Sequence, residues 1–89
     1  MLTLIMHHEV KNYADWKPVY DSDEADRLAV GCKQIGLYHA VDNPNKITLV
    51  FEIPSVEAMN EFMARPELKE RMERGGVISQ PEIHVLTEI

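Results

Sequence analysis

The 89-residue sequence predicts one small α+β domain, with strand, helix, hairpin, helix and strand following in that order. Three observations predict it. Apolar residues alternate in segments at both ends and in the middle of the chain, which is the period of a half-buried strand. Two intervening segments carry apolar residues at helical spacing and each is followed by glycine. A turn-forming Asp-Asn-Pro-Asn run connects the two middle strands.

The first strand is expected over residues 2–10, with one face more apolar than the other. The side chains of the apolar face are Leu2, Leu4, Met6, His8 and Val10. A helix is expected next, from Tyr13 or Trp16 to about Val30. Asn12 and Asp15 are both suited to cap its start, and the glycine after Val30 is suited to its end.

The hairpin is expected to pair residues 34–41 with residues 46–53 around a five-residue loop, residues 42–46. Residues that oppose one another must share a face of the sheet. The predicted register therefore places Ile35, Leu37, His39 and Val41 opposite Ile53, Phe51, Leu49 and Ile47.

The second helical segment is expected to begin after Ser55 and to restart at Pro66. Its apolar stripe comprises Val56, Met59, Phe62 and Met63, followed by Leu68 and Met72 after the restart. Glu67 with Arg71, and Glu70 with Arg74, have the spacing of surface ion pairs. Gly75 and Gly76 end the segment, and a last strand is expected over residues 82–89.

This order of elements predicts a ferredoxin-like βαββαβ fold, an antiparallel four-stranded sheet with both helical segments on one face. The other face then carries a mixture of polar side chains, Gln34 among them, and apolar ones. The apolar members are Ile5, Tyr38, Val50 and Leu86. Such a face suits a second copy of the sheet, so we expect a homodimer.

Composition excludes several classes of partner. The formal net charge is -6, so no basic surface is available for nucleic acid. The apolar run at residues 2–6 is too short for a membrane span or a signal sequence, and we expect a cytoplasmic protein. The single cysteine, Cys32, has no partner for a disulfide or a Cys-x-x-Cys site and is expected to pack as a small apolar residue.

The motifs resemble those of the dimeric α+β barrel superfamily over essentially the whole chain. The resemblance is carried by four groups of residues: His8-x-Val10 leading into Asn12-Tyr13-x-x-Trp16-Lys17-x-Val19-Tyr20-Asp21; the 42–45 hairpin; Leu49-Val50-Phe51-Glu52; and Ala58-x-x-x-Phe62 with Pro66-x-Leu68-Lys69-x-x-Met72. That superfamily includes antibiotic biosynthesis monooxygenases, haem-degrading oxygenases, muconolactone isomerase and stress-responsive barrel proteins. The resemblance implies a homodimer with a ligand cleft between sheet and helices in each subunit.

The resemblance also bears on cofactors. Cofactor-free monooxygenases of the superfamily hold an aromatic substrate with Trp and Asn side chains, and here the second helical segment offers Asn60 but no tryptophan. Haem-degrading relatives take their axial histidine from this segment, and residues 55–76 contain none. We expect neither haem nor another cofactor.

Two charged residues lie on the sheet-facing side of the first helix, together with Trp16 and Tyr20. They are Asp23 and Arg27, four residues apart. They could form an ion pair at the edge of the core. Alternatively, Arg27 could anchor an anionic or carbonyl group of a ligand, with Asp23 beside it and Trp16 and Tyr20 as walls.

His8 and His39 are predicted on the helix-facing sides of their strands, where each could exchange a proton with a ligand. The remaining walls of the predicted cleft are Phe51, Phe62 and Met63. On the other face, His7, His84 and Glu52 form an alternative metal-ligand set, but their sequence spacing is not that of a metal site, and we expect no metal.

The sequence thus predicts a protein that binds a small aromatic or apolar molecule, with His8, His39 and Arg27 as catalytic candidates. The reaction expected is of a cofactor-independent oxygenase-like or an isomerase- or cyclase-like kind. The alternative is a non-enzymatic ligand-binding or interaction module of the same fold, in which these residues are structural.

Overall fold

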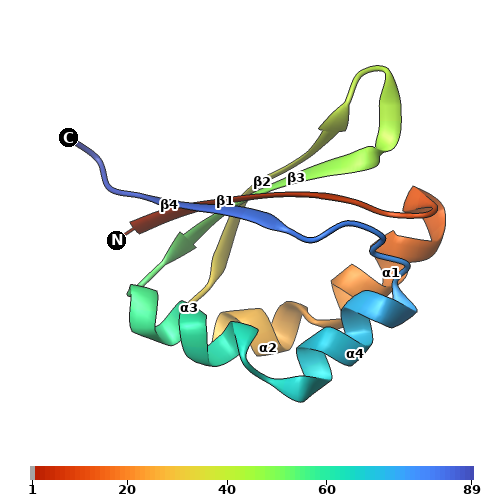
Figure 1. Cartoon of the computed structure of the whole chain (residues 1–89). Coiled ribbons are helices and arrows are strands. Elements are labelled where there is room, and N and C mark those ends of the chain that lie inside the picture. Colours follow the sequence, from red (N-terminus) through yellow and green to blue (C-terminus); the bar gives the residue numbers. More distant parts are fainter. Residues whose placement is uncertain (1) are drawn as a thin grey trace.

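Strands and helical segments follow one another in the predicted order, with each helical segment divided in two (Figure 1). The computed structural model describes residues 2–89. Its strands are β1 (Leu2–Glu9), β2 (Lys33–Ala40), β3 (Asn43–Ile53) and β4 (Glu82–Leu86), and its helices are α1 (Tyr13–Ser22), α2 (Glu24–Ala29), α3 (Val56–Met63) and α4 (Pro66–Arg74). The predicted α+β class is confirmed.

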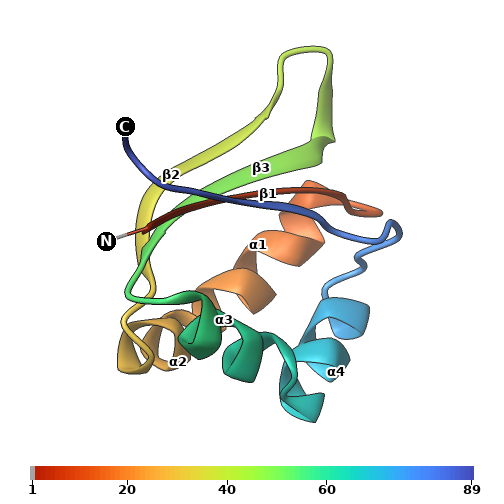
Figure 2. The ribbon, with the colours of Figure 1, turned by 60° about the vertical axis from the view of Figure 1, so that its left-hand side comes forward.

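The four strands form one antiparallel sheet in the order β2-β3-β1-β4. All four helices lie on the same side of it, and the opposite side has no helix (Figures 1 and 2). In β1, Leu4 opposes Phe51 and Met6 opposes Leu49, so the apolar faces of the two central strands coincide. This is the predicted ferredoxin-like arrangement.

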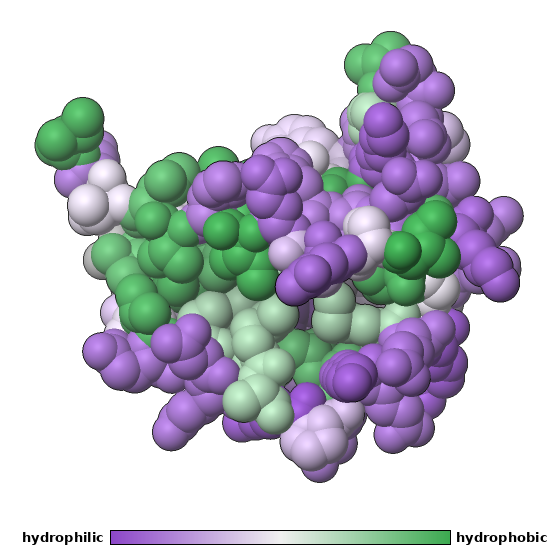
Figure 3. All heavy atoms as spheres, in the orientation of Figure 1, coloured by the Kyte–Doolittle hydropathy of each residue, from purple (hydrophilic) through white to green (hydrophobic). Residues whose placement is uncertain are grey.

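The core lies between the sheet and the helices. Its most completely buried side chains are Leu4, Val10, Ile47 and Ile53, all from the predicted apolar faces. Coverage is weaker under β4, where Ile83 and Val85 point toward the helices yet remain 39% and 41% exposed. Hydrophobic residues consequently gather at the surface below the sheet, around β4 and the helices beneath it (Figure 3).

The first predicted helix is broken at Asp23, whose backbone (φ -93°, ψ 0°) leaves the helical region. Ser22 is a poor residue for a helix interior because its hydroxyl competes for backbone groups, and here it donates to the carbonyl of Val19 at 2.6 Å. Asn12 caps the start as predicted, since its side chain accepts from the amide of Asp15. Gly31, with φ of 80°, follows the end of α2.

The predicted hairpin register is wrong by two residues over most of its length. His39 opposes Ile47 and Leu37 opposes Leu49, and β3 begins at Asn43, so the turn is much tighter than a five-residue loop. A bulge at Ile35 leaves that side chain 54% exposed. Gln34, expected on the open face, instead opposes Phe51 on the helix face and accepts a hydrogen bond from the Tyr20 hydroxyl at 2.6 Å.

The second helical segment follows its prediction, with Ser55 accepting a hydrogen bond from the amide of Ala58 at the start of α3. The separate helix α4 begins at Pro66 and buries none of its side chains. The last strand is shorter than predicted, because β4 ends at Leu86. Within residues 2–89, no helix has the length and hydrophobicity to cross a membrane.

Candidate functional site

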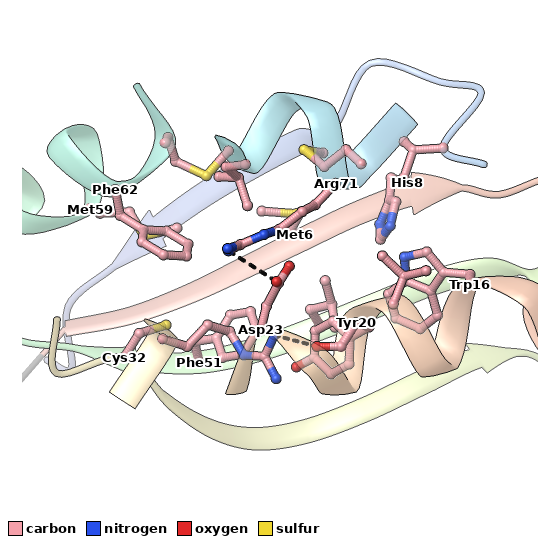
Figure 4. A pocket seen from close by; sticks show the side chains of 17 residues that line it. Met6, His8, Trp16, Tyr20, Asp23, Cys32, Phe51, Met59, Phe62 and Arg71 are labelled. Atoms are coloured by element: carbon pink, nitrogen blue, oxygen red, sulfur yellow. Dashed lines mark hydrogen bonds and ion pairs between the residues drawn. The ribbon is translucent and has the colours of Figure 1, made fainter. Parts of the chain in front are cut away.

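A narrow cavity of about 70 Å³ lies between the helix-facing side of the sheet and the helices, and we call it the inner cleft (Figure 4). Most of its walls are apolar: Met6 and Leu49 from the sheet, Met59 from α3, and Leu68 and Met72 from α4. Of the residues predicted for a site, the inner cleft brings together His8, Trp16, Tyr20, Asp23, Arg27, Phe51, Phe62 and Met63. His39 is not part of it.

One wall of the inner cleft is a stack of side chains from α1 and α2. The rings of Trp16 and Tyr20 are stacked with centroids 4.8 Å apart, and the Arg27 guanidinium lies 3.8 Å from the centre of the Tyr20 ring. The Tyr20 hydroxyl is held by Gln34, and burial raises the pKa of Tyr20 to about 12. Tyr20 is therefore neutral near pH 7 and serves as a wall and not as an acid.

Asp23 does not pair with Arg27, so the ion pair considered from their spacing is absent. Arg27 instead donates from Nη1 to the backbone carbonyl of Tyr20 at 2.8 Å. The carboxylate of Asp23, which is 7% exposed, lies 3.0 Å from Nη1 of Arg71. Its Oδ1 has no hydrogen-bond partner of good geometry, so this contact is an ion pair without a well-aligned hydrogen bond.

Arg71 is the functional candidate that sequence reasoning missed. It reaches from α4 across the mouth of the inner cleft to Asp23 (Figure 4). It also donates a hydrogen bond to the carboxylate of Asp26. That hydrogen bond, followed by the charge of Asp23, raises the pKa of Arg71. The predicted surface pair with Glu67 is wrong because these two carboxylates occupy the guanidinium. The sequence feature that could have indicated this contact is the pair of acids three residues apart, Asp23 and Asp26, which share one side of the helical segment.

His8 is the buried titratable group whose environment is most unusual. It is 7% exposed, and its Nδ1 has no hydrogen-bond partner among the described residues. Its ring lies edge-on to Trp16, with centroids 5.5 Å apart. Burial lowers the pKa of His8 from 6.5 to about 4, because the charged ring would lose its hydration. Near pH 7 the inner cleft therefore contains a neutral imidazole with an unused polar atom.

His39 lies in a second, wider hollow of about 450 Å³, which we call the outer groove; its walls include His8, His39, Lys46, Ser79 and Gln80. His39 is exposed, and its Nδ1 lies 2.9 Å from the carbonyl of Ala40. Since a carbonyl can only accept, Nδ1 is the donor in this contact. His8 borders both the inner cleft and the outer groove.

The alternative metal-ligand set on the open face is not assembled. The rings of His7 and His84 are 6.3 Å apart, but Glu52 pairs with Thr3 while His7 pairs with Thr48, four residues along β3. Nε2 of His84 lies 3.0 Å from Glu82. In the part of the chain that the structure describes, no three His, Cys, Asp or Glu residues are close enough to hold a metal ion.

Cys32 also borders the inner cleft, although its predicted role was packing alone. It is buried, and burial raises the pKa of its thiol. The thiol is therefore protonated and unreactive near pH 7, in keeping with a packing role.

Acidification is expected to destabilise the fold through His8. Its pKa is about 4 in the folded chain and near 6.5 when unfolded, so between these values the unfolded chain binds more protons. The free energy of unfolding should therefore fall as the pH decreases through this range, by about 3 kcal/mol once pH 4 is reached. Urea unfolding at pH 7 and pH 4 measures it. Between pH 7 and pH 4, the free energy of unfolding of His8→Phe should fall by about 3 kcal/mol less than that of the wild-type protein. Equal decreases in the two proteins would contradict the prediction.

Comparisons with solved structures identify the fold. A protein from Bordetella bronchiseptica assigned provisionally as an antibiotic biosynthesis monooxygenase is similar at a TM-score of 0.81 and 18% identity, over 99% of this chain and 96% of that one. SnoaB, a cofactor-independent oxygenase from Streptomyces nogalater, is similar at a TM-score of 0.74 and 16% identity, over 98% of this chain and 91% of that one. An uncharacterised NIPSNAP domain protein from Burkholderia xenovorans is similar at a TM-score of 0.71 and 10% identity, over 100% of this chain and 95% of that one.

These similarities show that the chain has the ferredoxin-like fold of antibiotic biosynthesis monooxygenase proteins, which the resemblance in its motifs implied. No family model and no curated protein sequence matches the chain. The likeness is thus one of fold, and function must be argued from the inner cleft.

Proposed function

We propose that the chain binds a small aromatic or apolar molecule in the inner cleft and that His8 exchanges a proton with it, in a cofactor-independent oxygenase-like or isomerase-like reaction. The observation that supports this proposal is the buried, neutral His8 with its unpartnered Nδ1. A buried polar atom without a partner costs free energy, so its presence at a cavity wall points to a ligand that supplies the missing hydrogen bond.

The chemistry follows from the neutral ring. As the substrate loses a proton to His8, negative charge develops beside the ring and raises the pKa of His8, because an opposite charge favours the protonated form. Returning the proton to another substrate atom completes an isomerisation. In the oxygenase reaction, the substrate anion gives electrons to O₂; a CH₂ group becomes C=O, the second oxygen atom leaves as water, and no external reductant is needed.

His39 is proposed as the second proton-transfer group. It shares the outer groove with His8, and the contact of its Nδ1 with the Ala40 carbonyl orients the ring. Its exposure lets it exchange protons with water, so it can return a proton from His8 to solvent.

The walls favour an apolar ligand. Phe51, Phe62 and Met63 line the inner cleft together with Met59 and Met72. The cavity of about 70 Å³ is roughly half of the ~150 Å³ that holds benzene in an engineered cavity, so an aromatic ligand requires side chains to move. Methionine side chains, which have several rotatable bonds, permit this adjustment.

The small cavity is also compatible with the alternative function, a ligand-binding module that is not an enzyme, because such a module needs space for the ligand alone. In that case a ligand would fill the inner cleft without being consumed. The two functions differ in turnover and not in binding.

We also propose that the chain forms a homodimer through the open face of its sheet. Tyr38 and Leu86 are 60% and 46% exposed on that face, and Ile5 and Val50 lie between them in the two central strands. The face has no helix to cover it, and a second sheet would bury these side chains.

A thermal-shift screen of small aromatic and apolar compounds is expected to find ligands that raise the melting temperature by about ten degrees or more, since a ligand at a hundred times its Kd adds about 2.7 kcal/mol. Binding should also change the fluorescence of Trp16, the only tryptophan. Hits are then assayed for oxygen uptake and for isomerisation. Binding without turnover would favour the module, and the absence of any stabilising compound would contradict the proposed cleft.

A further inference from the structure

We infer that the ligand of the inner cleft is a small carboxylate whose charged group binds Arg27. This inference rests on the proposed function and adds the chemical class of the ligand.

Arg27 is a buried cation without a carboxylate partner. It is only 7% exposed, yet among residues 2–89 it forms no ion pair. One hydrogen bond, from Nη1 to the carbonyl of Tyr20, engages a guanidinium that has five N–H groups. The Tyr20 ring covers one face of the guanidinium and leaves its edge as the part that can receive an anion.

The carboxylate that the helical spacing offers to Arg27 is taken by another residue. Asp23 is one turn before Arg27, but the break between α1 and α2 lets it lie 3.0 Å from Arg71. Asp21 and Glu24 share an outer hollow with Arg27 and form no ion pair with it. The N–H groups of Arg27 that donate no hydrogen bond are not sealed from solvent, so an anion from outside the chain can reach them and supply the missing ion pair.

The charges that line the inner cleft favour an anion. Two arginines line it, but Arg71 is already paired with Asp23 and with Asp26 outside the lining, so Arg27 is the lining cation whose charge no described carboxylate offsets. The other titratable groups of the wall are neutral near pH 7: His8 because its pKa is lowered, Tyr20 and Cys32 because theirs are raised. The chain as a whole has a net charge of -6, which repels anions elsewhere, so anion binding would be specific to this cavity.

A carboxylate fits the Arg27 guanidinium better than a neutral carbonyl does. Its two oxygens match the planar fork of a guanidinium, and charge-assisted hydrogen bonds are about twice as strong as neutral ones. The same cavity offers Phe51, Phe62 and Met59 to the apolar part of the ligand. His8 remains available to exchange a proton with that part.

The test compares benzoate with benzamide, which have the same size and differ in charge. Titrations of ¹⁵N-labelled protein followed by NMR are expected to give a Kd for benzoate at least about tenfold lower than that for benzamide. Shifts should be largest at the Trp16 indole and at the amides of Phe51 and Arg27. Arg27→Met should remove the preference, so that the Kd values of benzoate and benzamide become equal within error.

Lys69→Met is the matched control, because it removes the same charge from an exposed position of α4 that lines no described cavity. It should leave the preference for benzoate intact. Equal binding of the two compounds to the wild-type protein would overturn the carboxylate inference while leaving the proposed small-molecule cleft in place. Binding of neither, together with a negative thermal-shift screen, would overturn both. If Arg27→Met does not fold, the wild-type comparison alone decides.

Discussion

Val50→Glu is expected to convert the proposed homodimer into a monomer or to prevent folding. Val50 lies in β3 opposite Ile5, in the middle of the open face, where a second sheet would remove it from water. A carboxylate placed there would be buried without a partner, at a cost of several kcal/mol in each subunit. Sedimentation velocity at micromolar concentration distinguishes the two states, and far-ultraviolet circular dichroism reports whether the chain still folds.

Lys69→Glu provides the control, since Lys69 is exposed on α4, away from the open face. This variant should sediment as a dimer. Leu86→Lys, on the same face as Val50, should behave as Val50→Glu does. A wild-type protein that sediments as a monomer would show that the open face is not a dimer interface.

His8→Phe is expected to lower turnover by about 10² to 10⁴-fold, the range over which a positioned proton-transfer group contributes to catalysis. Phenylalanine has a flat ring of similar size without nitrogens. The substitution therefore removes the buried Nδ1 that has no hydrogen-bond partner, and the variant is expected to fold. The measurement is the rate of conversion of a compound found in the thermal-shift screen, with the melting temperature recorded alongside.

His39→Gln tests the second histidine separately. Its ring is exposed in the outer groove, where water can replace it as a proton acceptor, so the expected loss is about tenfold or less. Unchanged turnover in His8→Phe would overturn the assignment of His8. Loss of turnover in His39→Gln alone would move the proton transfer to the outer groove.

The faces of the central strands were predictable because burial in a sheet follows a strict two-residue period. Leu4 and Met6 on one strand, and Leu49 and Phe51 on the other, all face the helices. The hairpin register was not predictable in the same way. The pairing shifts twice, at Ile35 and next to the turn between His39 and Ala40. The bulge at Ile35 moves Gln34 to the helix face, where it accepts a hydrogen bond from Tyr20, a residue that only the folded chain brings near it.

The candidate site shows the same division. Trp16, Tyr20 and Arg27 were found from helical periodicity because they lie on one face of adjoining helices. Arg71 was not, because its partners are 45 or more residues away in the sequence and its local spacing to Glu67 suggested a surface pair. Periodicity identifies which side chains face a cavity, whereas the pairing of charges within it depends on tertiary contacts.

The small area that α4 buries against the rest of the chain affects ligand affinity. Because none of its side chains is fully buried and only Leu68 packs against the core in part, α4 can separate from the sheet at a lower cost in buried surface than the other walls of the inner cleft. The contacts of Arg71 with Asp23 and Asp26 hold it in place. A ligand too large for the closed cavity binds only the fraction of molecules in which α4 has moved. Its apparent Kd is then its intrinsic Kd divided by that fraction, so the ion pairs on the outside of the cleft, as much as the residues inside it, determine how tightly a large ligand is held.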